Sequence, residues 1–158
     1  MTVKKIFTLC ALLVAGALAA SNPNYVTALR TPDVTVSAAK PATVTMNFRV
    51  ASGYHINSNH PQSDLLIPTE LKLQAPAELR IAEPSFPAGK DFALSFDPQE
   101  KLSVYSGDFA VAARVRPAPS TAPGAYRVHG ELSYQACNDR ACFPPQKIPV
   151  SFDVTIQK

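Results

Sequence analysis

Hydrophobic and polar residues alternate with a period of two over most of the chain, which is the pattern of β-strands that bury one face. In the clearest run, residues 43–50, the apolar side chains of Val44, Met46, Phe48 and Val50 alternate with polar ones. The same alternation predicts three further strands, over residues 109–115, 126–134 and 148–156. Weaker patterns predict shorter strands over residues 33–37, 69–74, 79–82 and 102–105.

Proline separates most of these runs: the chain has 15 prolines in 158 residues. That frequency and spacing disfavour long helices and favour short strands joined by turns. Seven or eight short strands with one apolar face each predict two antiparallel sheets packed face to face. We therefore expect an all-β fold, an immunoglobulin-like antiparallel β-sandwich, and the chain length suits a single domain.

The first twenty residues have a different character. Two lysines precede an uncharged, mostly apolar run over residues 6–18, and Ala17-Leu18-Ala19 puts small residues where a signal peptidase reads them. We predict a cleaved signal peptide, residues 1–19, and one mature domain, residues 20–158. An uncleaved N-terminal anchor is the alternative interpretation.

Loss of the signal peptide changes the charge and the cysteine count. The formal charge of +3 loses two lysines and becomes about +1, so no nucleic-acid-binding surface is indicated. Of the three cysteines, Cys10 leaves with the signal, and Cys137 and Cys142 remain. Two cysteines of an exported protein normally form a disulfide with each other.

The two cysteines, with four residues between them, lie in a turn between the last two strong strands. Asn138-Asp139 between them favours a tight turn, which would bring the two Cα atoms within the distance that a disulfide needs. Closing so short a loop stabilises a fold by only about 2 kcal/mol, and a turn leaves the sulfurs reachable. Thiol–disulfide exchange explains this placement, whereas a passive staple of the hairpin is the other interpretation of the spacing.

Other chemistries have weaker support in the sequence. A metal site built from His55, His60, His129 and the cysteines is conceivable, but these residues lack the paired spacing of structural zinc ligands. No glycine-rich phosphate loop and no nucleophile elbow are present. We therefore expect no metal and no cofactor.

The segment Tyr134-Gln135-Ala136-Cys137, followed by Cys142-Phe143-Pro144-Pro145 and a final alternating strand, resembles the N-terminal periplasmic domain of the DsbD family of thiol:disulfide interchange proteins. The resemblance extends over about residues 33–156. Further segments resemble that family in the same order, namely residues 53–58, 86–90 and 102–107.

The resemblance implies a periplasmic immunoglobulin-like domain with a redox-active cysteine pair. It implies that Cys142 attacks the disulfide of a target and that Cys137 resolves the mixed disulfide. It also implies a cap loop with an aromatic residue that shields the pair. By position, this loop corresponds to about residues 95–101, with Phe96 and Asp97 as the candidate residues.

Three more residues are candidates for the surroundings of the pair. Tyr54 and His55 lie in the segment that resembles the family's aromatic patch, and Phe143 follows Cys142 directly. We expect Phe143 to be the first aromatic residue to test for contact with a partner.

The resemblance also implies a relay of the protein-disulfide reductase type. Its partners would be oxidised periplasmic thiol–disulfide proteins on one side and a membrane or thioredoxin-like electron donor on the other. DsbD itself continues into membrane and thioredoxin-like domains, so a chain complete at Lys158 would need a separate donor. The alternative is a non-catalytic binding or adaptor sandwich with a structural disulfide.

Overall fold

A computed structural model describes residues 23–37, 39–94 and 97–158 of the chain. The described residues form strands and connecting turns, without a helix. The strands of the first sheet lie in the order β1 (Val26–Ala28), β3 (Ala42–Val50), β9 (Asp108–Pro117) and β6 (Leu79–Ile81). Those of the second sheet lie in the order β2 (Val34–Val36), β12 (Gln146–Ile156), β10 (Gly124–Tyr134) and β5 (Glu70–Gln74).

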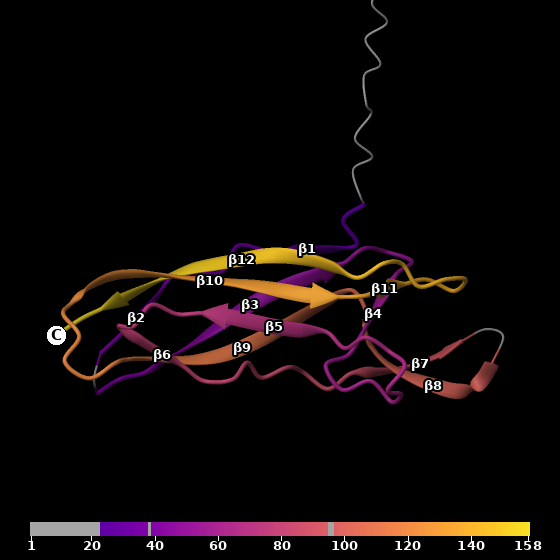
Figure 1. The fold of residues 1–158 in the computed structure, drawn as a ribbon, viewed down its shortest axis with the longest axis horizontal. Helices are drawn as coiled ribbons and strands as arrows, with labels where there is room; N and C mark the ends of the chain where they lie inside the picture. Colours follow the sequence, from indigo (N-terminus) through magenta and orange to yellow (C-terminus); the bar gives the residue numbers. More distant parts are fainter. Residues whose placement is uncertain (1–22, 38, 95–96) are drawn as a thin grey trace, which may run out of the picture.

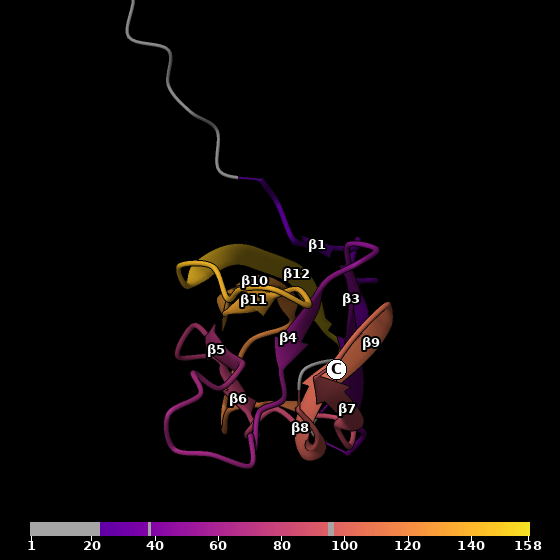
Figure 2. The same ribbon diagram turned by 90° about the vertical axis from the view of Figure 1, so that its right-hand side faces the viewer.

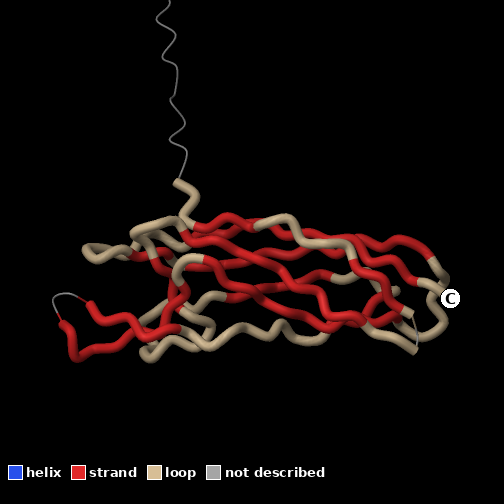
Figure 3. Tube along the Cα trace, turned by 180° about the vertical axis from the view of Figure 1, so that it is seen from behind, coloured by secondary structure: helices blue, strands red, loops and turns tan. Residues whose placement is uncertain are grey.

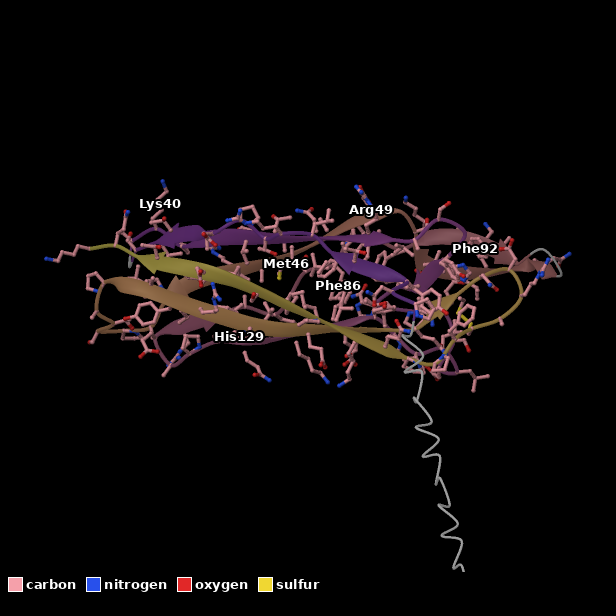
Figure 4. All side chains as sticks on the ribbon, turned by 90° about the horizontal axis from the view of Figure 1, so that it is seen from above. Lys40, Met46, Arg49, Phe86, Phe92 and His129 are labelled. Carbon is pink, nitrogen blue, oxygen red and sulfur yellow. A yellow bond between two sulfur atoms is a disulfide. The ribbon has the colours of Figure 1, made fainter. Side chains whose placement is uncertain are left out.

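These two sheets form the layers of an elongated sandwich (Figure 1). The apolar positions of the predicted alternation are the buried ones. In β3 they are Val44, Met46, Phe48 and Val50, and Figure 4 shows Met46 in the middle of the molecule. In the other layer they include Val128, Leu132, Val150, Phe152 and Val154. The predicted immunoglobulin-like β-sandwich is therefore confirmed.

Strand pairing accounts for the length of the sandwich. Strands β10 and β12 pair antiparallel over their whole length, with Val128 opposite Phe152, and β3 pairs antiparallel with β9. Strand β2 runs parallel to β12 at its far end. All eight predicted strands are present, although β8 begins earlier than expected.

A third sheet lies at one end of the sandwich and was not expected from the sequence. Its strands lie in the order β11 (Ala136–Cys137), β4 (His55–Asn57), β8 (Asp97–Tyr105) and β7 (Lys90–Leu94). Figure 2, viewed from that end, shows β4 between β11 and β8. This small sheet connects the strand that carries Cys137 to the hairpin of β7 and β8.

The prediction of a cap loop over residues 95–101 is wrong in its secondary structure. Residues 97–101 belong to β8, in which Asp97 and Lys101 pair with Leu94 and Ala93 of β7. Strands β7 and β8 form a hairpin that extends beyond the sandwich in Figure 3. Asp97 is the first residue of β8, and Phe96 lies outside the described residues. The pattern misled because these strands carry many polar residues, and a strand with one exposed face lacks a continuous apolar run.

The predicted signal peptide, residues 1–19, and Cys10 within it also lie outside the described residues. Within the part that the structure describes, no helix has the length and apolar character needed to cross a membrane.

Candidate functional site

Cys137 and Cys142 form a disulfide at the end of the sandwich where the third sheet lies. The two sulfur atoms are 2.03 Å apart and the two Cα atoms are 4.0 Å apart. The cysteines face each other as an isolated antiparallel pair within the turn that connects β11 to β12. The predicted pairing at a tight turn is what the structure shows.

Backbone hydrogen bonds on both sides of the disulfide hold this turn closed. The amide of Asn138 donates to the carbonyl of Ala141 at 2.9 Å, and the amide of Phe143 donates to the carbonyl of Ala136 at 2.8 Å. The Asn138 side chain adds two bonds, because its Oδ1 accepts from the amides of Arg140 and Ala141, each at 2.9 Å. The cysteines are therefore positioned by the turn as well as by the bond between them.

The two sulfur-bearing residues differ in exposure. Cys137 lies in β11 and is 3% exposed, whereas Cys142 is exposed at the surface. The expectation that the turn leaves both sulfurs reachable is therefore wrong for Cys137. Pairing with β4 covers it, and that strand was not predicted. An incoming sulfur can reach Cys142 without a rearrangement of the sandwich.

His55 lies directly across from Cys137 in the pairing of β11 with β4. Its side chain is buried, and burial lowers its pKa below the usual value, against a smaller opposing effect of Asp139. The imidazole is therefore neutral at neutral pH. His55 was expected to lie near the cysteine pair, and the structure places it there.

Phe92 is the aromatic residue of the hairpin that reaches this site. Its ring centroid is 4.3 Å from that of His55, and Figure 4 shows Phe92 at the end of the molecule that carries the disulfide. Phe92 was not among the predicted site residues, and Phe96, which was, lies outside the described residues. The available signal was a second aromatic residue near the predicted cap loop.

Tyr54 and Phe143 belong to an aromatic cluster beside the turn. The Phe143 ring stacks on that of Tyr25 with centroids 4.8 Å apart, and it lies 5.8 Å from Tyr54. The rings of Tyr25 and Tyr54 are 4.8 Å apart. Tyr25 was not a predicted site residue. Because Phe143 is half-buried in this cluster, its first role is to anchor the turn to the first sheet.

Of the three histidines of the conceivable metal site, His55 alone lies beside the cysteines. His60 and His129 are exposed, and His129 lies on the outer face of β10. Among the described residues, no group of three or more histidine, cysteine, aspartate or glutamate side chains is placed to hold a metal ion.

Replacing Asn138 with alanine should weaken the disulfide without unfolding the domain. The variant loses two hydrogen bonds that hold the turn, so the reduced cysteines spend less time facing each other. A loss of about 1 kcal/mol corresponds to an about fivefold smaller equilibrium constant for disulfide formation against glutathione. Asn138→Asp keeps an oxygen acceptor and should retain most of that constant. Equal constants for Asn138→Ala and the unaltered protein would show that the disulfide alone shapes the turn.

Residues 25–153 match the family model of the N-terminal domain of the thiol:disulfide interchange protein DsbD. The chain belongs to this family. The match includes the first sheet, most of the second, the hairpin, the cysteine turn and the aromatic cluster around it. No curated protein sequence matches the chain.

Among solved structures, the chain is similar to the reduced DsbD N-terminal domain of Neisseria meningitidis, with 25% identity and a TM-score of 0.40 over 71% of this chain and 75% of that one. The same Neisseria domain, in a complex with the PilB N-terminal domain, is also 25% identical. It matches with a TM-score of 0.40 over 70% of this chain and 73% of that one. The N-terminal periplasmic domain of ScsB from Proteus mirabilis is 14% identical in sequence. It matches with a TM-score of 0.47 over 81% of this chain and 44% of that one.

Membership of the DsbD N-terminal domain family assigns thiol–disulfide interchange to this chain. The Cys137–Cys142 disulfide is the group in the described residues that can carry it. The assignment favours a redox-active pair over the alternative of an adaptor sandwich with a passive staple.

Proposed function

We propose that this domain is a protein-disulfide reductase relay in which Cys142 attacks and Cys137 resolves. The observation that carries the proposal is the difference in exposure between the two cysteines. In the reduced protein, the Cys142 thiolate attacks one sulfur of a partner disulfide, and the other partner sulfur leaves as a thiolate. Cys137 then attacks Cys142 Sγ and releases the second partner sulfur. Two electrons pass to the partner, and the protein ends with its disulfide closed.

We also place this reaction in the periplasm, after cleavage of residues 1–19 from a mature domain that begins at residue 20. The charged start, apolar run and small residues of that segment support export. A disulfide in a small turn is stable in an oxidising compartment and rare in a reducing one.

The partners follow from the same chemistry. The acceptor is a periplasmic protein that carries a disulfide, because the turn presents Cys142 at the surface, where the sulfur of another protein can reach it. The donor is a membrane or thioredoxin-like protein with a dithiol, which reopens the Cys137–Cys142 disulfide by the same exchange in reverse. Nothing in the exchange requires a cofactor or a nucleic acid.

The reduction potential of the cysteine pair tests the proposal. The protein would be equilibrated with glutathione buffers and its free thiols trapped and counted. A value between about −180 and −270 mV lies where natural exchangers work. A value well below about −300 mV would mark a structural disulfide and contradict the proposal.

Replacing Phe92 with alanine should speed up reduction of the disulfide by small thiols. The Phe92 ring packs against His55, which lies opposite Cys137, so its removal opens a path from solvent to the buried sulfur. We expect the rate with dithiothreitol to rise several-fold. Phe86→Ala is the matched control, because Phe86 packs against Tyr105 and not against His55. A rate unchanged by Phe92→Ala, or raised equally by both variants, would show that Phe92 does not shield the pair.

A further inference from the structure

A buried histidine lies next to the disulfide, and the exchange between the two cysteines and a partner leaves it without a role. His55 is 3% exposed and lies directly opposite Cys137 in an antiparallel pair. Residues in such a position point their side chains to the same face, with Cβ atoms about 4.5–5.5 Å apart. The imidazole and the Cys137 sulfur therefore share one face of the third sheet, and Phe92 packs against the imidazole there.

The imidazole has an unused polar atom. His55 Nε2 is buried and has no hydrogen-bond partner, and among the described residues the other such side-chain atom is Asn57 Oδ1, two residues along the same strand. Burial of an unpaired polar atom costs stability, so such atoms in native proteins call for an explanation. In the oxidised protein, Cys137 Sγ carries no proton and has nothing to donate. Reduction creates an S–H group at that position.

We infer that His55 Nε2 accepts the proton of the Cys137 thiol when Cys137 resolves the mixed disulfide. The inference rests on the proposed function, in which Cys137 is the resolving residue. A buried thiol is a poor nucleophile because only the thiolate attacks, and burial raises the free energy of the thiolate. A neighbouring base removes this obstacle, as it does for other protein nucleophiles.

Resolution of the mixed disulfide combines one proton transfer with one exchange of disulfide bonds. The proton moves from Cys137 Sγ to His55 Nε2, and the thiolate attacks Cys142 Sγ. The Cys137–Cys142 bond forms as the bond between Cys142 Sγ and the partner sulfur breaks. The partner sulfur leaves with the electron pair of that bond and takes up a proton, either from the imidazolium or from water.

The charges around His55 fit a proton acceptor. Burial lowers the pKa of His55, so the imidazole is neutral at neutral pH and can accept. Asp139 of the cysteine turn acts in the opposite direction and stabilises the imidazolium once it forms. The turn also carries exposed Arg140. On the hairpin, the charged residues near Phe92 are Lys90, Asp91 and Lys101, of which Asp91 and Lys101 pair with each other at 3.4 Å.

The two attacks can be timed separately with the symmetrical disulfide of thionitrobenzoate. Mixing it with the reduced protein releases one coloured thiolate when Cys142 attacks and a second when Cys137 resolves. His55→Gln keeps a hydrogen-bonding amide but cannot take up a proton. We expect it to slow the second release about tenfold or more and to leave the first unchanged. His129→Gln, on the outer face of β10, should change neither.

The pH dependence of the second release distinguishes a His55 that accepts a proton from one that only fills space. In the unaltered protein, the second release should slow as the pH falls through the lowered pKa of His55, because the imidazolium cannot accept a proton. His55→Gln should lack this inflection. A second release with the same rate and profile in His55→Gln would overturn the inference. Loss of the first release in the unaltered protein would instead contradict the proposed role of Cys142.

A measurement on the unaltered protein covers the case in which His55→Gln fails to fold. The pKa of His55 can be followed by NMR in the oxidised and the reduced protein. We expect it to differ between the two, because only the reduced protein offers the imidazole a thiol or thiolate. The same pKa in both states would overturn the inference.

Discussion

Replacing Cys137 with alanine should turn the protein into a trap for its oxidised partner, whereas replacing Cys142 should abolish exchange altogether. Cys142 is exposed and can attack, but without Cys137 nothing breaks the mixed disulfide that forms. Without Cys142, the remaining cysteine is 3% exposed and cannot reach a partner sulfur. A non-reducing gel after incubation of each reduced variant with oxidised periplasmic proteins measures the difference. Adducts should accumulate with Cys137→Ala and be absent with Cys142→Ala.

The double variant supplies the baseline for this comparison. Cys137→Ala with Cys142→Ala should keep the fold, because a disulfide that closes so short a loop stabilises by only about 2 kcal/mol. It should form no adduct. Adducts that accumulate with Cys142→Ala and not with Cys137→Ala would reverse the roles of the two cysteines. Such a result would show that the exposure of the oxidised turn does not decide which sulfur attacks.

Replacing Tyr25 with alanine should cause the largest loss of stability of any single change near the site. Tyr25 is 6% exposed, and its ring packs against both Tyr54 and Phe143. Truncation of a buried aromatic side chain leaves a cavity and costs about 3–5 kcal/mol. We expect about 3 kcal/mol here, since the cluster lies near the surface and can partly collapse. Urea unfolding followed by circular dichroism measures this loss.

The same change should also disturb the cysteine turn. Phe143 follows Cys142 and stacks on Tyr25, so the turn loses its anchor on the first sheet. We expect faster reduction of the disulfide by small thiols in Tyr25→Ala than in the unaltered protein. Tyr25→Phe keeps the stacking ring and should change neither quantity by much. Tyr126→Ala is a second control, because Tyr126 is half-buried on β10 at the end away from the cysteine turn. A loss of stability equal to that of Tyr25→Ala would show that the aromatic cluster has no special weight.

The sandwich could be predicted because its strands repeat one simple pattern. In β3, β9, β10 and β12, every second side chain enters a core between two sheets, and a period of two in the sequence reports this directly. The disulfide in the cysteine turn could also be predicted, because its two residues are close in the sequence. Two residues five positions apart, with turn formers between them, can meet without help from the rest of the fold.

The surroundings of the disulfide could not be read in this way. The β4 strand brings His55 opposite Cys137 although the two lie 82 positions apart in the sequence, and no local pattern encodes that register. The hairpin of β7 and β8 was predicted as a loop over residues 95–101, since its polar strands lack the alternation of the core. Phe92 and Tyr25 therefore escaped notice, although each packs beside a residue that had been singled out.

The sequence by itself determined the fold class and the pairing of Cys137 with Cys142, since these depend on alternation and on neighbouring residues. The resemblance of the cysteine segment to the DsbD N-terminal domain indicated the kind of chemistry. The tertiary structure alone decided that Cys142 is exposed and Cys137 buried, that His55 faces the buried cysteine, and that Phe92 packs against this histidine. These properties depend on which distant segments pack together. Burial, charge and access of a sulfur atom are set by its neighbours in space, and the third sheet assembles those neighbours from three separate parts of the chain.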